Sequence, residues 1–237
     1  MGRALLRWSA TTLIVAAVGG CAGSPAVKED RPSRRTARTA QPAVARDPFE
    51  DALLPSFQQL IPIMAPKSGP YSSLPAATMA AGVQQTPPGA TVKPMNCALW
   101  AGPDGKQFGT AAASVVAFRK PGDTSPGGVQ AWEELVSSAG QSRQAALGTG
   151  PQPGCRTVRV SHQGNTLTFE EKPPPLLGNG SRGAVLTPSS PNSRRTWVVT
   201  FVGNGYVGVV FMQGEVTKAQ MDAFATAAYN KARQKLG

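Results

Sequence analysis

The sequence predicts an α+β fold, in which one mostly antiparallel sheet of five or six strands is covered on at least one face by helices. Two segments within residues 157–170 alternate apolar and polar residues around a short polar turn, which predicts a hairpin. The segments 196–202 and 206–212 are strongly apolar and predict a second hairpin at the centre of the sheet. The chain ends in an apolar stripe of helical spacing, which predicts a C-terminal helix packed on the sheet.

The first 20 residues have the composition of a secretory leader. Basic residues precede an apolar run, which is too short to span a hydrocarbon core of about 30 Å. The run ends at Val18-Gly19-Gly20-Cys21, which resembles the lipobox of bacterial lipoproteins. The resemblance implies that residues 1–20 are removed as a signal peptide. It also implies that Cys21 carries a lipid with palmitate-type chains and anchors the protein on the outer side of the cell membrane. An ordinary leader with a chance cysteine is the alternative.

Residues 21–46 contain almost nothing that could enter a core, so we expect a basic tether before a folded domain of residues 47–237. Removal of Arg3 and Arg7 with the leader leaves 22 of the 24 basic residues against 13 acids. Outside the cell membrane, such a surface meets anionic lipids and polymers rather than nucleic acid. The tether is predicted either to contact an anionic membrane surface or to be a solvated spacer. Five of its arginines have no acid between them: Arg31, Arg34, Arg35, Arg38 and Arg46.

The folded domain begins with a predicted helix. Apolar residues recur at steps of three and four over residues 49–61, and Asp47 is suited to cap the helix at its N-terminus. Pro55 interrupts the pattern, so we expect two short helices or one kinked helix. Residues 65–95 are rich in proline and predict mostly irregular chain, with a short helical turn around 76–81.

The remaining elements are predicted from hydrophobic periodicity and turn residues. Residues 128–138 have apolar residues at helical spacing, followed by Gly140, and predict a helix. Thr217 and Gln220 fit a capping box at the start of the last helix. Residues 97–100 predict a short strand or an anchored turn. The predicted strands that follow are 111–118, 157–161, 166–170, 184–187, 196–202 and 206–212.

Two cysteines remain after the one assigned to lipid. Cys97 and Cys155 enclose a long loop, and an even pair in an exported chain predicts a disulfide. Such a bridge would stabilise the fold by about 4 kcal/mol on the chain-entropy model. Two buried free thiols are the alternative.

No arrangement of residues predicts an enzyme, a metal site or a cofactor. His162, the single histidine, lies in a predicted hairpin turn without other ligands at metal-binding spacing. The acidic pairs Glu133-Glu134 and Glu170-Glu171 are adjacent, so their side chains point in different directions and cannot flank a substrate. Neither cysteine has a histidine partner nearby, and no serine-nucleophile motif occurs.

Two groups of residues could instead form a binding surface. Five aromatic residues could line an apolar ligand pocket between helix and sheet, although they could equally be core: Trp100, Trp132, Trp197, Tyr206 and Phe211. Five arginines could form a patch for an anionic partner if the loops bring them together: Arg156, Arg159, Arg182, Arg194 and Arg195.

A lipobox, two further cysteines, a strand-strand-helix ending and an Ala-, Arg-, Gly- and Pro-rich composition resemble the small lipoproteins of mycobacteria and related actinobacteria. The ending and the cysteine pair are also similar to the extracytoplasmic sensor domains of PknH-type kinases. Those are α/β domains with two disulfides and a ligand-binding cleft, and this chain has cysteines for one bridge. This second resemblance implies ligand capture by a cleft over the sheet.

Two functions follow as hypotheses. The domain is either a non-enzymatic binding module for an envelope lipid or other amphipathic ligand, or an accessory protein. The accessory protein would hold a partner protein at the cell envelope through its basic face.

Overall fold

The computed structural model describes residues 47–84, 86–123, 125, 128–190 and 193–237. Cys21 and the tether arginines lie outside these residues. The strands are β1 (Ile61–Pro62), β2 (Lys67–Pro70), β3 (Thr91–Lys93), β4 (Ala112–Arg119), β5 (Gln130–Ser137), β6 (Thr157–His162), β7 (Asn165–Glu171), β8 (Ser181–Pro188), β9 (Thr196–Val202) and β10 (Tyr206–Gln213). The helices are α1 (Pro48–Ala52), the 3-10 turn η1 (Tyr71–Ser73), α2 (Pro75–Gln84), α3 (Gly105–Phe108), α4 (Arg143–Leu147) and α5 (Lys218–Leu236).

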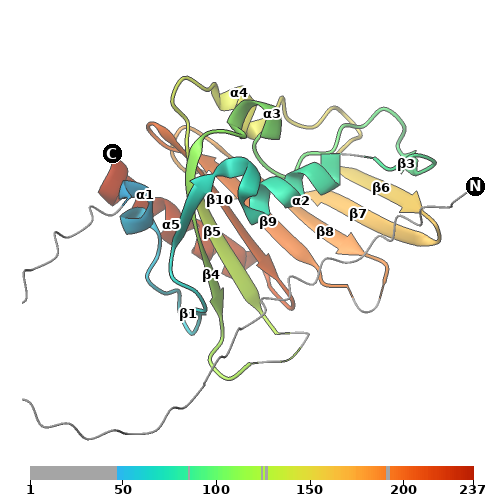
Figure 1. Cartoon of the computed structure of the whole chain (residues 1–237). Coiled ribbons are helices and arrows are strands. Elements are labelled where there is room, and N and C mark those ends of the chain that lie inside the picture. Colours follow the sequence, from blue (N-terminus) through green and yellow to red (C-terminus); the bar gives the residue numbers. More distant parts are fainter. Residues whose placement is uncertain (1–46, 85, 124, 126–127, 191–192) are drawn as a thin grey trace, which may run out of the picture. The chain divides into compact units, whose positions relative to one another are not determined.

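Within the described residues, ten strands form one sheet, in the order β1-β4-β5-β10-β9-β8-β7-β6-β3, with β2 also paired to β4 (Figure 1). Every strand pair is antiparallel. The predicted α+β class is therefore confirmed, but the predicted number of five or six strands is too small. The short strands β1, β2 and β3 account for much of the difference, because two to four residues give too weak a pattern to be recognised.

The sheet has a hydrophobic cluster on each face. α1 and α5 pack on one face, where residues such as Phe118, Phe201 and Phe224 are buried. η1, α2, α3 and α4 cover the other face, where the buried residues include Phe108 and Phe169. We call these the α5 face and the α2 face. Helices on both faces explain why β9 and β10 are buried along almost their whole length.

The predicted helix at residues 128–138 is wrong, because residues 130–137 form β5, an interior strand of the sheet between β4 and β10 (Figure 1). Its side chains alternate between the two faces, with Leu135 in the cluster of the α5 face and Val136 in that of the α2 face. Both faces of β5 are covered, so the apolar residues do not show the period of two that would distinguish a strand from a helix.

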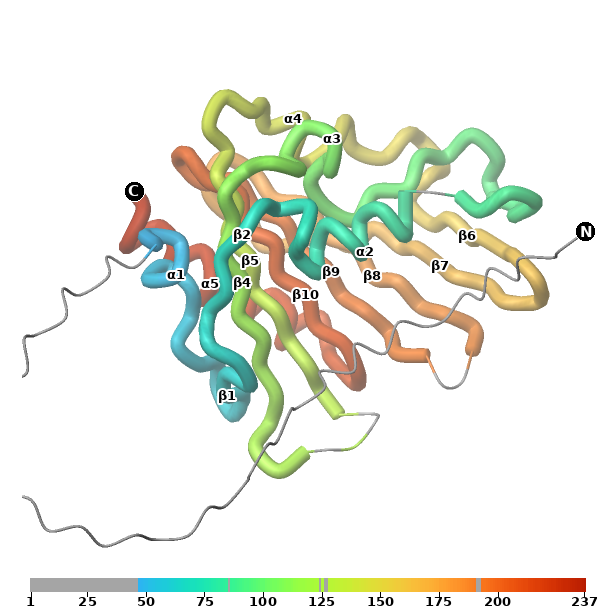
Figure 2. The backbone as a smooth tube through the Cα atoms, in the orientation of Figure 1, coloured from blue at the N-terminus to red at the C-terminus, as the bar shows by residue number. Residues whose placement is uncertain are grey.

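The N-terminal segment wraps around the edge of the sheet (Figure 2). Residues 47–84, which we call the edge strap, run from α1 on the α5 face, along β4 as β1 and β2, to α2 on the α2 face. Asp47 caps α1 as predicted, and its carboxylate accepts the Phe49 N–H at 2.9 Å. The helix ends before Pro55, and the residues after it form a turn and a strand rather than the second or kinked helix that was expected.

The C-terminal elements agree with the sequence prediction. β9 and β10 pair in register from Val202–Val207 to Thr196–Gln213, and β6 and β7 form the other predicted hairpin. α5 starts at a capping box, in which the Thr217 hydroxyl accepts the Gln220 N–H and the Gln220 side chain accepts the Thr217 N–H. The predicted helix on the sheet is therefore confirmed.

Candidate functional site

The five aromatic residues that could have lined one pocket lie on opposite faces of the sheet. Trp197 and Tyr206 belong to the cluster of the α5 face, and the Trp197 indole donates to the Val216 carbonyl at 3.0 Å. Trp132 and Phe211 lie on the α2 face, where their rings stack with centroids 4.8 Å apart. Trp100 packs against the guanidinium of Arg182. The five residues therefore do not line a single pocket.

The five arginines differ in exposure. Arg156, Arg159 and Arg195 are exposed, whereas only 8% of the Arg182 surface is accessible. Arg194 is half-buried, and its guanidinium donates to the Gly128 carbonyl at 3.2 Å. Because Arg182 is occupied inside the protein, the five residues do not form one common surface patch.

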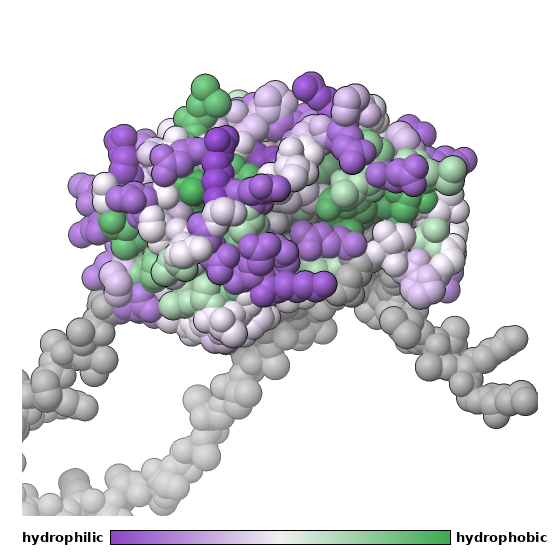
Figure 3. Space-filling view, turned by 90° about the horizontal axis from the view of Figure 1, so that it is seen from above, coloured by the Kyte–Doolittle hydropathy of each residue, from purple (hydrophilic) through white to green (hydrophobic). Residues whose placement is uncertain are grey.

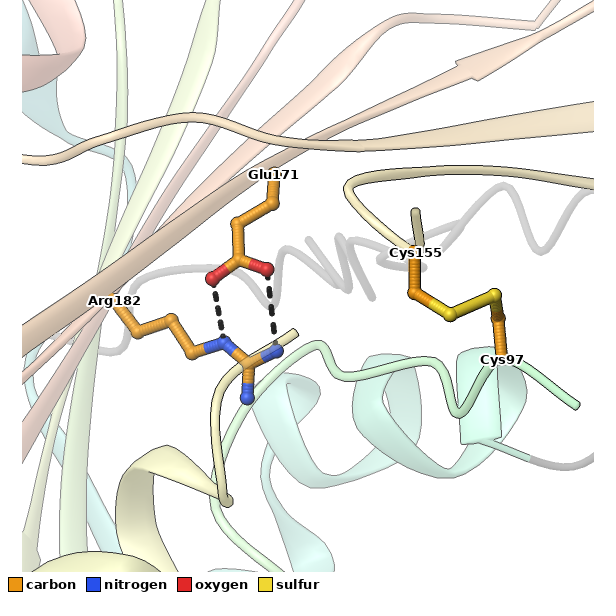
Figure 4. The surroundings of a disulfide bond; sticks show 4 residues. All are labelled: Cys97, Cys155, Glu171 and Arg182. Carbon is orange, nitrogen blue, oxygen red and sulfur yellow. Dashed lines mark hydrogen bonds and ion pairs between the residues drawn. A yellow bond between two sulfur atoms is a disulfide. The ribbon is translucent and has the colours of Figure 1, made fainter. Parts of the chain in front are cut away.

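Arg182 is the centre of a buried polar cluster next to the C-terminal end of α4. Its Nε and Nη2 atoms donate to the two carboxylate oxygens of Glu171, at 3.0 and 3.3 Å (Figure 4). Its third nitrogen donates to the Leu147 carbonyl at 2.7 Å, and its guanidinium carbon lies 4.6 Å from the centre of the Trp100 ring. A paired, hydrogen-bonded arginine of this kind fixes the elements that it joins, which here are β7, β8 and the end of α4.

A glycine allows the chain to pass close to this cluster. Gly148 has a φ of +66°, and a Cβ atom at this position would lie 2.8 Å from an Arg182 nitrogen and 3.3 Å from the Trp100 ring. A larger residue would be strained and would also displace the arginine. Gly148 therefore allows the loop after α4 to pack directly against the buried Arg182–Glu171 ion pair.

The disulfide lies beside this cluster (Figure 4). Cys97 and Cys155 are joined by an S–S bond of 2.03 Å, so the predicted bridge is confirmed. The Cys155 N–H donates to the Gln152 carbonyl at 2.9 Å, and the Glu171 N–H donates to the Arg156 carbonyl at 2.8 Å. These contacts fix the loop before β6 between the disulfide and the Arg182–Glu171 pair.

The same loop forms an open hollow with a volume of about 410 Å³. We call it the 151–157 hollow. Its lining combines proline rings with an amide, a hydroxyl and one guanidinium, from Pro151, Gln152, Pro153, Gly154, Arg156 and Thr157. On the surface of the molecule around α3 and α4, hydrophilic residues are interspersed with separate apolar areas (Figure 3). A second hollow, next to Trp197 and Lys218, has a volume of only about 10 Å³.

Two carboxyl groups are buried in the middle of the sheet. Glu133 and Glu134 have no accessible surface, and they point to opposite faces, as expected for neighbours on a strand. Glu133 accepts the Leu54 N–H at 2.8 Å, and Glu134 accepts the Ala76 N–H at 2.8 Å. Both donors belong to the edge strap. The two glutamates therefore hold the strap to β5 from both sides of the sheet.

Burial raises the pKa of each of these glutamates to about 8, although the strap N–H groups act in the opposite direction. Glu133 Oε1 and Glu134 Oε2 have no hydrogen-bond partner among the described residues. Tyr71 lies near Glu134, and burial together with the charge of Glu134 raises the pKa of its phenol. The two side chains point in different directions, as expected for adjacent residues. The sequence did not indicate the burial of the two glutamates, because a helix was predicted for this segment.

The described residues contain no group of three or more His, Cys, Asp or Glu side chains that could hold a metal ion. His162 lies at the end of β6, opposite Asn165 in the hairpin. No helix in the described part of the chain is long and apolar enough to cross a membrane.

Comparisons with known proteins identify the fold but no family. No protein-family model matches the chain, and no curated protein matches it. The fold is similar to that of an uncharacterized protein (Rv0999 ortholog) from Mycobacterium smegmatis, with a TM-score of 0.52 and 13% sequence identity over 79% of this chain and 97% of that one. The extracellular domain of PknH from Mycobacterium tuberculosis matches with a TM-score of 0.42 and 16% identity, over 81% and 97% of the two chains.

Proposed function

We propose that this protein is a non-enzymatic binding module, anchored through a lipid on Cys21 to the outer side of the cell membrane. In this proposal the 151–157 hollow binds the polar end of an amphipathic anionic molecule of the cell envelope. The observation that supports it most directly is the position of Arg156, an exposed guanidinium in a hollow of about 410 Å³.

The size and lining of the hollow indicate the class of ligand. Its volume is near the lower end of the range for small-molecule sites, about 300–1,000 Å³, so it suits a head group rather than long acyl chains. Arg156 can bind a phosphate or carboxylate in bidentate fashion, and the proline rings offer apolar contacts beside it. An anionic lipid head group has both of these features.

The rigidity of the loop also favours binding. Cys155 lies between Gly154 and Arg156, and its bridge to Cys97 prevents the lining from moving away from the sheet. The Arg156 carbonyl is fixed by the Glu171 N–H, which belongs to the buried ion pair with Arg182. A site that is formed before the ligand arrives loses less conformational entropy on binding.

The alternative function, in which a basic face holds a partner protein, has less support. It would gain most from a convergent arginine patch, and Arg182 is buried in an ion pair instead. The remaining exposed arginines could still contact anionic molecules individually. We therefore prefer ligand binding in the 151–157 hollow to the partner-protein hypothesis.

The proposal is tested with short-chain phosphatidylglycerol, a soluble anionic lipid, titrated calorimetrically into the purified full-length protein. Short-chain phosphatidylcholine serves as the neutral comparison. Arg156→Gln should weaken binding of the anionic lipid about tenfold to hundredfold, because a charge-assisted hydrogen bond is lost. The matched control is Arg159→Gln, which removes another exposed charge that does not line the hollow.

Three results would decide the matter. Tighter binding of the anionic lipid that depends on Arg156 and not on Arg159 supports the proposal. Equal effects of both variants would indicate general attraction to a basic surface and contradict it. No binding by the unmodified protein would contradict it as well.

A further inference from the structure

The edge strap contains a run of apolar residues that face solvent. All eight residues from 61 to 68 are exposed, and the first six of them are apolar. Ile61, Ile63 and Met64 expose 47%, 49% and 39% of their surfaces, which is unusual for large apolar side chains gathered within four positions. We call residues 61–66 the apolar edge segment.

The pairing of the strap with β4 explains this exposure. Ile61 and Pro62 pair with Arg119 and Phe118, and Lys67 pairs with Val115 farther along β4. Four residues of the strap, 63–66, therefore lie opposite only two residues of β4. The extra length is accommodated at the outer edge of the sheet, and no described strand lies beyond it (Figure 1).

Prolines make this edge a poor template for another strand. Pro62 and Pro66 lie in the apolar edge segment, and Pro70 ends β2. Proline has no N–H to donate, so a strand of a second copy could not form a regular ladder here. The segment therefore offers apolar side chains rather than backbone hydrogen bonds to whatever it contacts.

Cationic side chains flank these apolar residues. Arg119 is paired with Ile61, Lys120 follows it and is exposed, and Lys67 is exposed at the other end of the segment. Asp123 interacts electrostatically with Arg119 and Lys120 and offsets one of the three charges. Exposed apolar residues beside a net positive charge suit the interface of an anionic lipid bilayer, where side chains enter the acyl boundary and cations remain among the head groups.

The chain before the domain is of suitable length for this contact. Residues 21–46 separate the proposed lipid on Cys21 from the described domain, and Ile61 follows only 14 positions after Asp47. A flexible chain of 26 residues has a root-mean-square end-to-end distance of about 28 Å. A tether of the predicted kind would thus keep the domain within reach of the bilayer.

We propose that the apolar edge segment, with Lys67, Arg119 and Lys120, docks the folded domain on the surface of an anionic membrane. The contact would fix the orientation of the domain, which the lipid on Cys21 alone cannot do. The proposal rests on the proposed membrane anchoring, so lipid attachment at Cys21 is measured separately by mass spectrometry of the same preparation.

The test places an environment-sensitive fluorophore, NBD, on a cysteine introduced by Ile63→Cys in the full-length protein. Cys97 and Cys155 are not labelled because they form a disulfide, and a parallel sample without the introduced cysteine corrects for any label on Cys21. The protein is reconstituted into vesicles of phosphatidylcholine with or without phosphatidylglycerol. We expect a blue shift of the emission in the anionic vesicles, and quenching by lipids with a nitroxide near the acyl boundary.

The matched control is Leu176→Cys, because Leu176 is a large apolar residue that is 98% exposed and lies outside the segment. A label there should show neither the blue shift nor the quenching. Adding Arg119→Gln and Lys120→Gln to the Ile63→Cys variant should reduce the response to anionic vesicles toward that in neutral vesicles.

Several outcomes would overturn the proposal. An unchanged emission at position 63 in anionic vesicles, in a preparation that carries the lipid on Cys21, excludes docking while leaving the anchor intact. Equal responses at positions 63 and 176 would indicate general adsorption of the protein. A blue shift of the NBD emission that appears without vesicles as the protein concentration rises would show that the segment contacts a second copy of the chain instead of a membrane.

Discussion

The two faces of the sheet are covered in different ways. On the α5 face, one helix of 19 residues packs with its own capping box and a row of buried apolar residues. On the α2 face, shorter helices and loops are joined by the Cys97–Cys155 bridge, the Arg182–Glu171 ion pair and the contact of Glu134 with α2. The first face is held mainly by apolar packing of continuous sequence, and the second by specific links between distant residues.

The largest effect is expected from a change in the apolar packing of the α5 face. Phe224 is fully buried, and the centroid of its ring lies 4.9 Å from that of Phe57 and 5.9 Å from that of Phe118. Phe224→Ala should lower the free energy of unfolding by about 3–5 kcal/mol, because it removes buried apolar surface and leaves a cavity. Urea unfolding followed by circular dichroism measures this. Lys235→Ala, at an exposed position of the same helix, is the control. If both variants lowered the free energy of unfolding equally, apolar packing would not be what holds the α5 face.

Removal of the disulfide tests the link on the α2 face. Cys155→Ser should lower the free energy of unfolding by about 2–5 kcal/mol. The double variant with Cys97→Ser should lose about as much, because each change removes the same bond. Hydrogen exchange should become faster around residues 148–157 and change little in α5. Reductant should lower the melting temperature of the unmodified protein only, and a melting temperature indifferent to reductant would argue against a stabilising bridge.

The buried glutamates allow the same kind of group to be tested on both faces, since Glu133 lies on the α5 face and Glu134 on the α2 face. Burial raises both pKa values from 4.5 to about 8, so the folded protein binds these protons more tightly than the unfolded chain. Their contribution to stability is therefore complete below about pH 4.5 and is lost as the pH rises through about 8. Each group contributes a slope of at most about 1.4 kcal/mol per pH unit.

This slope is measured by melting temperatures between about pH 5 and about pH 8. Stability should fall with rising pH, and Glu133→Gln and Glu134→Gln should each flatten the profile. Burial raises the pKa of both carboxyl groups to about 8, although Lys231 acts against this shift at Glu133, so the two variants should flatten the profile to a similar extent. A profile that is identical in all three proteins would show that neither carboxyl changes its protonation on unfolding.

The smallest expected effect concerns the cap of α5. The Thr217 hydroxyl accepts the Gln220 N–H at 3.2 Å, and its loss in Thr217→Ala should cost about 1 kcal/mol. Thr217→Ser retains the hydroxyl and should restore most of the stability. Chemical unfolding of the three proteins checks this, and equal loss in the serine and alanine variants would show that the cap itself does not stabilise the helix.

The difference between the faces also explains what could be predicted from the sequence. The hairpin of β9 and β10 and the helix α5 were predicted correctly because each has a local pattern of adequate length. The disulfide was predictable from the number of cysteines in a chain whose sequence predicts export. The lipid on Cys21 remains a prediction, because this residue lies outside the described part of the chain.

Features that depend on distant contacts could not be predicted in the same way. β5 was predicted as a helix because its apolar residues have helical spacing and Gly140 follows them, whereas its two buried carboxyl groups accept N–H groups of the edge strap from opposite faces of the sheet. The ion pair of Arg182 joins β8 to β7 and α4, and no spacing in the sequence indicates it. The 151–157 hollow depends on loop geometry that the bridge to Cys97 fixes.

The position of β10 has a consequence for the order in which the protein can assemble. β1, β2, β4 and β5 form one side of the sheet, and β9, β8, β7, β6 and β3 form the other, with β10 lying between β5 and β9. The strand that unites the two sides is the last in the chain, and it pairs with β5 across about 70 intervening residues. Closure of the sheet must therefore wait until synthesis, and any export, has nearly reached the C-terminus. Until then the apolar edges of β5 and β9 remain open to wrong partners, so a long-lived partial chain is the form most at risk of aggregation.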